Sequence, residues 1–177
     1  IANNGILDGS EAGISGVTVT LYDSGNNLKG ATTTDPTGRY YFDNLAPGNY
    51  FVKVPASEFA SGKPLFNMLS STGADATQTL DLNDNGIDNA TPATNGILTN
   101  TFTLATGTMP INEDQTGYPG SLPDNSVNAT DDFGFLAQAD LAIVKTNPAG
   151  SAPPGGTTTY TLVVSNKGPA EVTAAPV

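Results

Sequence analysis

Apolar and polar residues alternate with a period of two near the start of the chain. Across residues 16–22, Val17, Val19 and Leu21 fall on one side, and threonine or tyrosine falls on the other. This alternation is typical of a strand with one buried face. Three more strands are predicted at 28–34, 39–42 and 49–54, joined by short turns. Four strands in about 40 residues predict antiparallel pairing in a β-sandwich.

The alternation fades in the middle of the chain and then resumes. Residues 57–99 are polar and irregular, and residues 109–125 predict a long acidic loop. No segment has a helical period. The remaining strands are predicted at 99–104, 128–136, 140–146, 157–165 and 171–177. The pattern therefore predicts an all-β chain with two modules, residues 1–137 and 138–177, which meet at a linker near Gln138.

Charge and composition exclude several classes of protein. The chain has 17 acidic and 6 basic residues and a formal net charge of −11, which argues against nucleic-acid binding. It has no cysteine and no histidine, which excludes disulfides, zinc sites built on these residues and Ser-His-Asp triads. No carboxylate pair stands out as a tuned acid and base, so we do not expect an enzyme. No apolar run reaches the roughly 18 residues of a membrane span, so none is expected in this chain.

Several stretches together resemble a known domain. They read Asn4-Gly-Ile-Leu-Asp8 with Glu11, Gly13-Ile-Ser-Gly-Val-Thr-Val-Thr-Leu21, Thr34-Asp-Pro-Thr-Gly-Arg-Tyr-Tyr-Phe42 and Leu45-Ala-Pro-Gly-Asn-Tyr50. In this order they are similar to the B-repeat domain of Sdr-type bacterial surface proteins, a relative of the collagen-adhesin B-type fold. The resemblance covers residues 1–137, with Asp132-Phe-Gly-Phe135 as a closing strand. It implies an Ig-like or prealbumin-like β-sandwich and calcium binding in the loop before the Gly-Val-Thr-Val strand.

Residues 139–177 resemble a second module, a conserved repeat domain of bacterial surface and envelope proteins. The resemblance rests on Asp140-Leu-Ala-Ile-Val-Lys-Thr146 and on Thr159-Tyr-Thr-Leu-Val-Val-Ser-Asn-Lys-Gly-Pro169. That family usually continues beyond the position of Val177, so the second module is expected to be incomplete. Completion by a longer chain or by a neighbouring subunit are both open. In related adhesins a Lys and an Asn condense into an isopeptide bond, for which Lys145 and Asn166 are candidates, with an exposed Lys and a turn Asn as the alternative.

The first oxygen-rich loop fits the second half of a calcium-binding pattern. Such a loop has side-chain oxygens at alternate positions, glycine at position six, a backbone carbonyl at seven and a bidentate Glu at twelve. With Gly5 at position six, the candidate ligands are Asn4, the Ile6 carbonyl, Asp8 and Glu11. The positions before Asn4 supply no ligand, so a polar turn that leads into a strand remains the alternative.

A second loop, residues 81–89, fits the first half of the same pattern. Asp81, Asn83 and Asn85 take positions one, three and five, and the Ile87 carbonyl takes position seven. Position twelve is a proline, which cannot supply the final carboxylate. An Asn- and Asp-rich turn is the alternative.

Nearby carboxylates are candidates for the ligands that this second loop lacks. Asp84 and Asp88 lie within it, and Asp131 and Asp132 would add ligands if the closing strand passes nearby. Calcium is therefore the expected cofactor, because it takes oxygen ligands and would order a region with few apolar side chains.

The expected function is structural. We expect a non-enzymatic module of a bacterial extracellular surface protein, which forms a calcium-stiffened stalk or polymeric fibre at the cell surface or in the extracellular matrix. Its partners would be neighbouring copies of the chain or adjacent repeat modules. One alternative is an adhesive module that binds a host or matrix protein or a glycan, and another is an accessory domain of a secreted enzyme.

Overall fold

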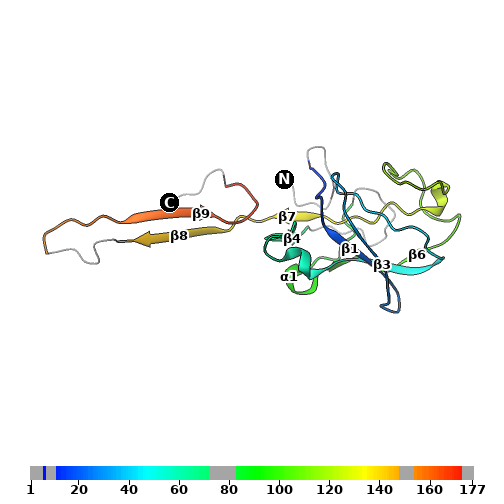
Figure 1. Ribbon diagram of the computed structural model, residues 1–177, viewed down its shortest axis with the longest axis horizontal. Coiled ribbons are helices and arrows are strands. Elements are labelled where there is room, and N and C mark those ends of the chain that lie inside the picture. Colours follow the sequence, from blue (N-terminus) through cyan, green and yellow to red (C-terminus); the bar gives the residue numbers. More distant parts are fainter. Residues whose placement is uncertain (1–5, 7–10, 72–82, 148–153, 173–177) are drawn as a thin grey trace. The chain divides into compact units, whose positions relative to one another are not determined.

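The computed structural model describes residue 6 and residues 11–71, 83–147 and 154–172, and forms two compact units, Ile1–Leu136 and Ala137–Val177 (Figure 1). The all-β class is confirmed. The described residues contain only short helical turns: the α-helix α1 (Pro92–Asn95) and the 3-10 helices η1 (Ala56–Phe59) and η2 (Asp124–Ser126). Within the same residues, no helix has the length and hydrophobicity needed to cross a membrane.

A five-stranded sheet forms the main layer of the first unit. Its strands are β1 (Thr18–Asp23), β2 (Leu28–Thr33), β3 (Gly48–Val54), β5 (Ile97–Leu98) and β6 (Phe102–Leu104). The strands run in the order β2-β1-β3-β5, and β6 pairs with the other end of β3. All of these pairs are antiparallel. The predicted local antiparallel pairing is therefore confirmed for β1, β2 and β3.

One face of this sheet carries the core. Val19 and Leu21 of β1 and Tyr50, Val52 and Val54 of β3 point to it, and each of these five is at most 6% exposed. They are joined by Phe59, Leu65 and Ile97 in one cluster. The paired strands β4 (Met68–Ser70) and β7 (Phe135–Ala137) lie against this cluster, and the rings of Phe59 and Phe135 are 6.1 Å apart. The core therefore lies between two layers of strands, as a β-sandwich requires.

Residues 39–42 are not a strand, so that prediction is wrong. Tyr40 and Phe42 lie on one side of the segment and pack against the core cluster, with their rings edge-on at 6.0 Å. The alternation in the sequence therefore reflects packing of side chains and not a backbone ladder. Similarly, the strand predicted at 128–136 is reduced to β7, and ahead of β7 the segment pairs through an isolated bridge between Asp132 and Asp84.

The second unit is a two-stranded antiparallel hairpin of β8 (Leu141–Thr146) and β9 (Thr161–Asn166). Ile143 lies opposite Val164, and Val144 lies opposite Val163. Because directly opposed residues share a face, the large aliphatic residues form two groups. The first face carries Leu141, Ile143, Leu162 and Val164, and the second carries Val144 and Val163; all of them are at least 42% exposed.

The hairpin register does not support an isopeptide bond between Lys145 and Asn166. Lys145 lies opposite Leu162, whereas Asn166 lies opposite Leu141, at the other end of the hairpin. Four residues of strand separate them, or about 13 Å. The Lys145 ammonium lies 3.9 Å from the centre of the Tyr160 ring, and the Asn166 side chain caps the Gly168 and Asp140 N–H groups.

Gly96, between α1 and β5, yields a stability prediction. Its φ is 74°, and a Cβ atom there would lie 2.3 Å from the Val54 carbonyl oxygen. Gly62 also has a positive φ, 82°, but a Cβ there meets nothing within 4 Å. We expect Gly62→Ala to lower the free energy of unfolding by about 1 kcal/mol and Gly96→Ala by about 3 kcal/mol. Urea denaturation followed by tyrosine fluorescence measures both; equal losses would contradict the close approach.

Candidate functional site

Three segments far apart in the sequence meet in the first unit. Ile6 forms an antiparallel β-bridge with Asn83, and the next residue, Asp84, forms a parallel bridge with Asp132. We call Ile6, Asn83, Asp84, Asn85 and Asp132 the loop junction. It brings Ile6 of the first oxygen-rich loop beside Asn83 of the second, and it meets the condition on which Asp132 became a candidate, because the closing segment does pass beside the second loop.

Asn85 fastens this junction from the inside. It is fully buried, and its backbone N–H donates to the Asp132 carbonyl at 3.0 Å. Its side-chain Oδ1 accepts the Asp132 N–H at 2.9 Å. Because both of these Asn85 groups are hydrogen-bonded, burying them costs little free energy, and the two bonds define the register of the two segments.

Asp84 is a buried carboxylate without full compensation. It is 3% exposed, and its Oδ1 accepts the Gly86 N–H at 2.8 Å. Its Oδ2 is buried and finds no hydrogen-bond partner of good geometry among the residues that the structure describes. Burial has the largest effect on Asp84, and the pKa of this carboxyl is raised to about 6. The Gly134 and Gly86 N–H groups and the Ser71 hydroxyl lower the pKa by less than burial raises it, and the charge of Asp88 raises it further. A buried carboxylate in this position favours either a proton or a cation.

Two glycines allow the backbone to close around Asp84. A Cβ at Gly86 would lie 2.9 Å from Asp84 Oδ1, and a Cβ at Gly134 would lie 3.0 Å from Oδ2 and 2.7 Å from Ser71 Cβ. The Ser71 N–H donates to the Gly134 carbonyl at 3.0 Å. The walls around this carboxylate are therefore mostly main chain.

Tyr40 holds the closing segment from another side. Its hydroxyl donates to the Asp131 carbonyl, and its ring lies 6.5 Å from that of Phe133. Burial, together with the charges of Asp131 and Asp132, raises the pKa of Tyr40 well above its ordinary value. Tyr40 therefore remains a neutral donor at any physiological pH.

Other carboxylates of the first unit are satisfied by their own turns. The Asn27 N–H and Lys29 hold the pKa of Asp23 far below its usual range. The Thr37 hydroxyl lowers the pKa of Asp35 in a similar way. Thr116 and Arg39 lower the pKa of Asp114, whose ion pair with Arg39 ties the long acidic loop to the turn before Tyr40. These groups are stable as exposed anions, and Asp84 differs from them in kind.

The predicted metal ligands differ in their contacts and in their exposure. Ile6 and Asn83 are bridged, and Asn85 uses its oxygen within the junction. Glu11 is half-buried, whereas Ile87 and Asp88 are exposed. The remaining candidates, Asn4, Asp8 and Asp81, lie outside the described residues.

The loop junction fits a cation in one respect. Among the described residues, no three acidic side chains converge where an ion could be held. However, Asp84 Oδ2 is a buried oxygen without a good partner, which is the donor that a hard cation takes. The sequence marked Asp84 only as a helper, because its burial depends on Phe133 and Gly134, which lie far along the chain.

Comparisons with known proteins agree with this architecture. The family model of the SdrD B-like domain matches residues 1–116. Serine-aspartate repeat-containing protein F of Staphylococcus epidermidis is 51% identical over 55 residues, which are 31% of this chain and 3% of that protein. A fibrinogen-binding protein of Staphylococcus epidermidis is 55% identical over 49 residues, or 28% of this chain and 4% of that protein. Serine-aspartate repeat-containing protein D of Staphylococcus aureus strain Newman is 51% identical over 55 residues, or 31% of this chain and 4% of that protein.

These relatives are much longer than the region they share with this chain, which spans only 3 to 4% of their length. No solved structure matches the chain significantly. The match of the family model covers well over half of the chain and includes the first loop and the main part of the sheet. This chain therefore belongs to the SdrD B-like domain family.

Proposed function

We propose that this chain is a structural, non-enzymatic module of a bacterial extracellular surface protein, in which calcium stiffens the loops of the first unit. The buried, incompletely bonded carboxylate of Asp84 carries the proposal, because it lies where three distant segments join. The surface location is supported by membership of the family and by the Sdr relatives.

Calcium has a defined task at the loop junction. Bound there, it would neutralise Asp84 and cross-link loops that few apolar side chains hold. The chain offers oxygens from both loops, and they are Asn4, Ile6, Asp8, Glu11, Asp81, Asn83, Asn85, Ile87 and Asp88, together with Asp84. A cross-link that joins the N-terminal segment, the middle of the unit and the closing segment would resist their separation under load.

The hairpin of the second unit supports a role in a stalk or fibre. A two-stranded hairpin with large aliphatic side chains on both faces is marginally stable alone in water. Its exposed residues therefore favour burial against a neighbouring copy or an adjacent repeat module. If each copy does this for the next, the contact does not close, and a filament results.

Adhesion is the second candidate function. One relative is named a fibrinogen-binding protein. A matrix protein is the other partner that we consider for a surface module of this kind. The shared segment is only 4% of that protein, so its named activity need not lie in this domain. The chain's own support for adhesion is a hollow on its main sheet, which is described in the next subsection.

The calcium proposal predicts a shift in thermal stability. In millimolar Ca²⁺, compared with chelator, the first unit is expected to melt about 5–10 °C higher, as saturation at about 100 times Kd would give for a chain of this size. Asp84→Asn should lose most of this shift. In chelator at neutral pH, the same variant should be at least as stable as the parent chain, because it removes a buried charge. Circular dichroism melting curves measure all four values.

Asp43→Asn is the matched control, because Asp43 is exposed and lies outside the loop junction. It should keep the full calcium shift. Identical melting of the parent chain in Ca²⁺ and in chelator would overturn the proposal, and so would a full shift in Asp84→Asn.

The fibre proposal predicts self-association through the first face of the hairpin. Sedimentation velocity between about 10 and about 500 µM should show a concentration-dependent rise in the sedimentation coefficient. The double variant Ile143→Thr/Val164→Thr should suppress it, because it polarises the face with four large aliphatic residues. Val144→Thr/Val163→Thr changes the other face and should have the smaller effect. A parent chain that stays monomeric throughout would show that the hairpin does not associate with copies of itself.

A further inference from the structure

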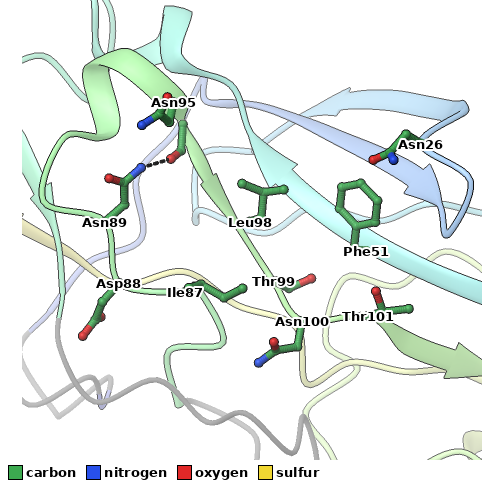
Figure 2. A pocket seen from close by; sticks show the side chains of 11 residues that line it. Asn26, Phe51, Ile87, Asp88, Asn89, Asn95, Leu98, Thr99, Asn100 and Thr101 are labelled. Carbon is green, nitrogen blue, oxygen red and sulfur yellow. Dashed lines mark hydrogen bonds between the residues drawn. The ribbon is translucent and has the colours of Figure 1, made fainter.

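A hollow of 510 Å³ lies on the main sheet, on the face opposite the core (Figure 2). It is formed by residues of β3, by the segment that leads into α1, by the end of α1, and by β5 with the residues after it. It is largely open to solvent and not an enclosed cavity.

The floor of the hollow is apolar and held in place. Phe51 lies parallel to the Tyr22 ring, with centres 5.3 Å apart and an interplanar angle of 10°. Leu98 lies opposite Lys53, two residues along β3 from Phe51, so Phe51 and Leu98 share a face. The Ile87 N–H donates to the Leu98 carbonyl at 2.7 Å, which places the 47%-exposed Ile87 beside it.

The rim of the hollow carries neutral polar side chains. Asn26 comes from the turn between β1 and β2, Asn95 from the last position of α1, and Asn100 and Thr101 from the segment after β5. Figure 2 shows them around Phe51, Leu98 and Ile87. Within the described part of the chain, the side-chain amides of Asn26 and Asn95 make no hydrogen bond and are exposed. Each amide therefore offers both donors and an acceptor to a ligand.

The walls are already formed without a ligand. The Asn89 side-chain Nδ2 donates to the Gly96 carbonyl at 2.6 Å, and the Asn89 Oδ1 accepts the Thr91 N–H at 2.9 Å. The buried Thr99 hydroxyl oxygen accepts the Val52 N–H at 3.0 Å. A preformed site avoids the cost of ordering its loops when the ligand binds.

Charge narrows the class of ligand. Among the described residues that line the hollow, none is a lysine or arginine, and Asp88 is the one that carries a charge. The chain as a whole carries a net charge of −11. An anionic ligand would therefore meet repulsion without a compensating cation.

We propose that this hollow binds a neutral oligosaccharide of two or three sugar residues. A sugar ring presents an apolar C–H face, which fits Phe51, Leu98 and Ile87, and a ring of hydroxyl groups that are both donors and acceptors, which fits the amides and Thr101. This site goes beyond the structural role and does not depend on bound calcium. A cationic peptide is the competing ligand, because Asp88 would pair with it and an aromatic ring face attracts cations, but neutral amides outnumber the single carboxylate among the described lining residues.

Saturation-transfer NMR with three neutral trisaccharides tests the proposal on the full chain. Cellotriose, maltotriose and tri-N-acetylchitotriose differ in linkage and in the N-acetyl group, and at least one should bind with a Kd of roughly 1–10 mM, as expected for a shallow site. The bound sugar should shift the side-chain amide signals of Asn26 and Asn95. A trigalacturonate of the same length carries negative charge and should not bind.

Variants separate the site from the fold. Asn95→Ala, at an exposed position, should weaken binding by about 3- to 10-fold, which is the value of one lost neutral hydrogen bond. Phe51→Ala should weaken it at least about 10-fold, and its melting temperature is measured alongside because the Tyr22 stack is also lost. Tyr41→Ala is the matched control, because Tyr41 is 49% exposed and is not in the lining; it should leave binding unchanged.

Three results would overturn the proposal. They are no saturation transfer from any of the three neutral sugars at about 20 mM, full binding by a folded Asn95→Ala/Phe51→Ala double variant, and tighter binding of trilysine than of every sugar. The last result would assign the hollow to a cationic peptide through Asp88. None of them bears on the calcium proposal, because the melting shift is measured independently.

Discussion

The first unit depends on the polar contacts that tie residues 83–86 to residues 131–134. The main sheet is ordered by its apolar face, but the chain has little apolar material to order its long connections, with 37% hydrophobic residues and 20 glycines. Asn85 replaces that missing packing with two buried hydrogen bonds to Asp132. Because such bonds lose most of their net value in water, they hold the loops only while the junction remains buried.

Burial at this junction has an electrostatic consequence. Asp84 loses water on both oxygens and regains a good hydrogen bond on only one. Among the described residues, the carboxylates of Asp23, Asp35 and Asp114 are stabilised as anions by their own turns, whereas burial raises the pKa of Asp84 and disfavours its charge. This combination of a closed backbone and a buried charge is the basis of the proposed role for calcium.

The two faces of the main sheet carry different kinds of side chain. One face is filled by Leu21, Val52 and their neighbours, and leaves nothing for a ligand. The other face carries the Tyr22 and Phe51 stack with neutral amides around it. The proposed mechanical role and the proposed binding role are therefore compatible in one domain, because they would use opposite faces of the same strands.

The all-β class, the local antiparallel pairing of β1 with β2, and the family follow from the sequence alone, because a period of two and short turns act locally. The sequence also located both oxygen-rich loops by composition. Only the tertiary structure decided that residues 39–42 pack as side chains without joining a sheet, that Lys145 and Asn166 lie apart, and that Asp84 rather than its neighbours is the buried carboxylate. These outcomes depend on contacts between residues distant along the chain, and local pattern carries no information about which distant segment a loop will meet.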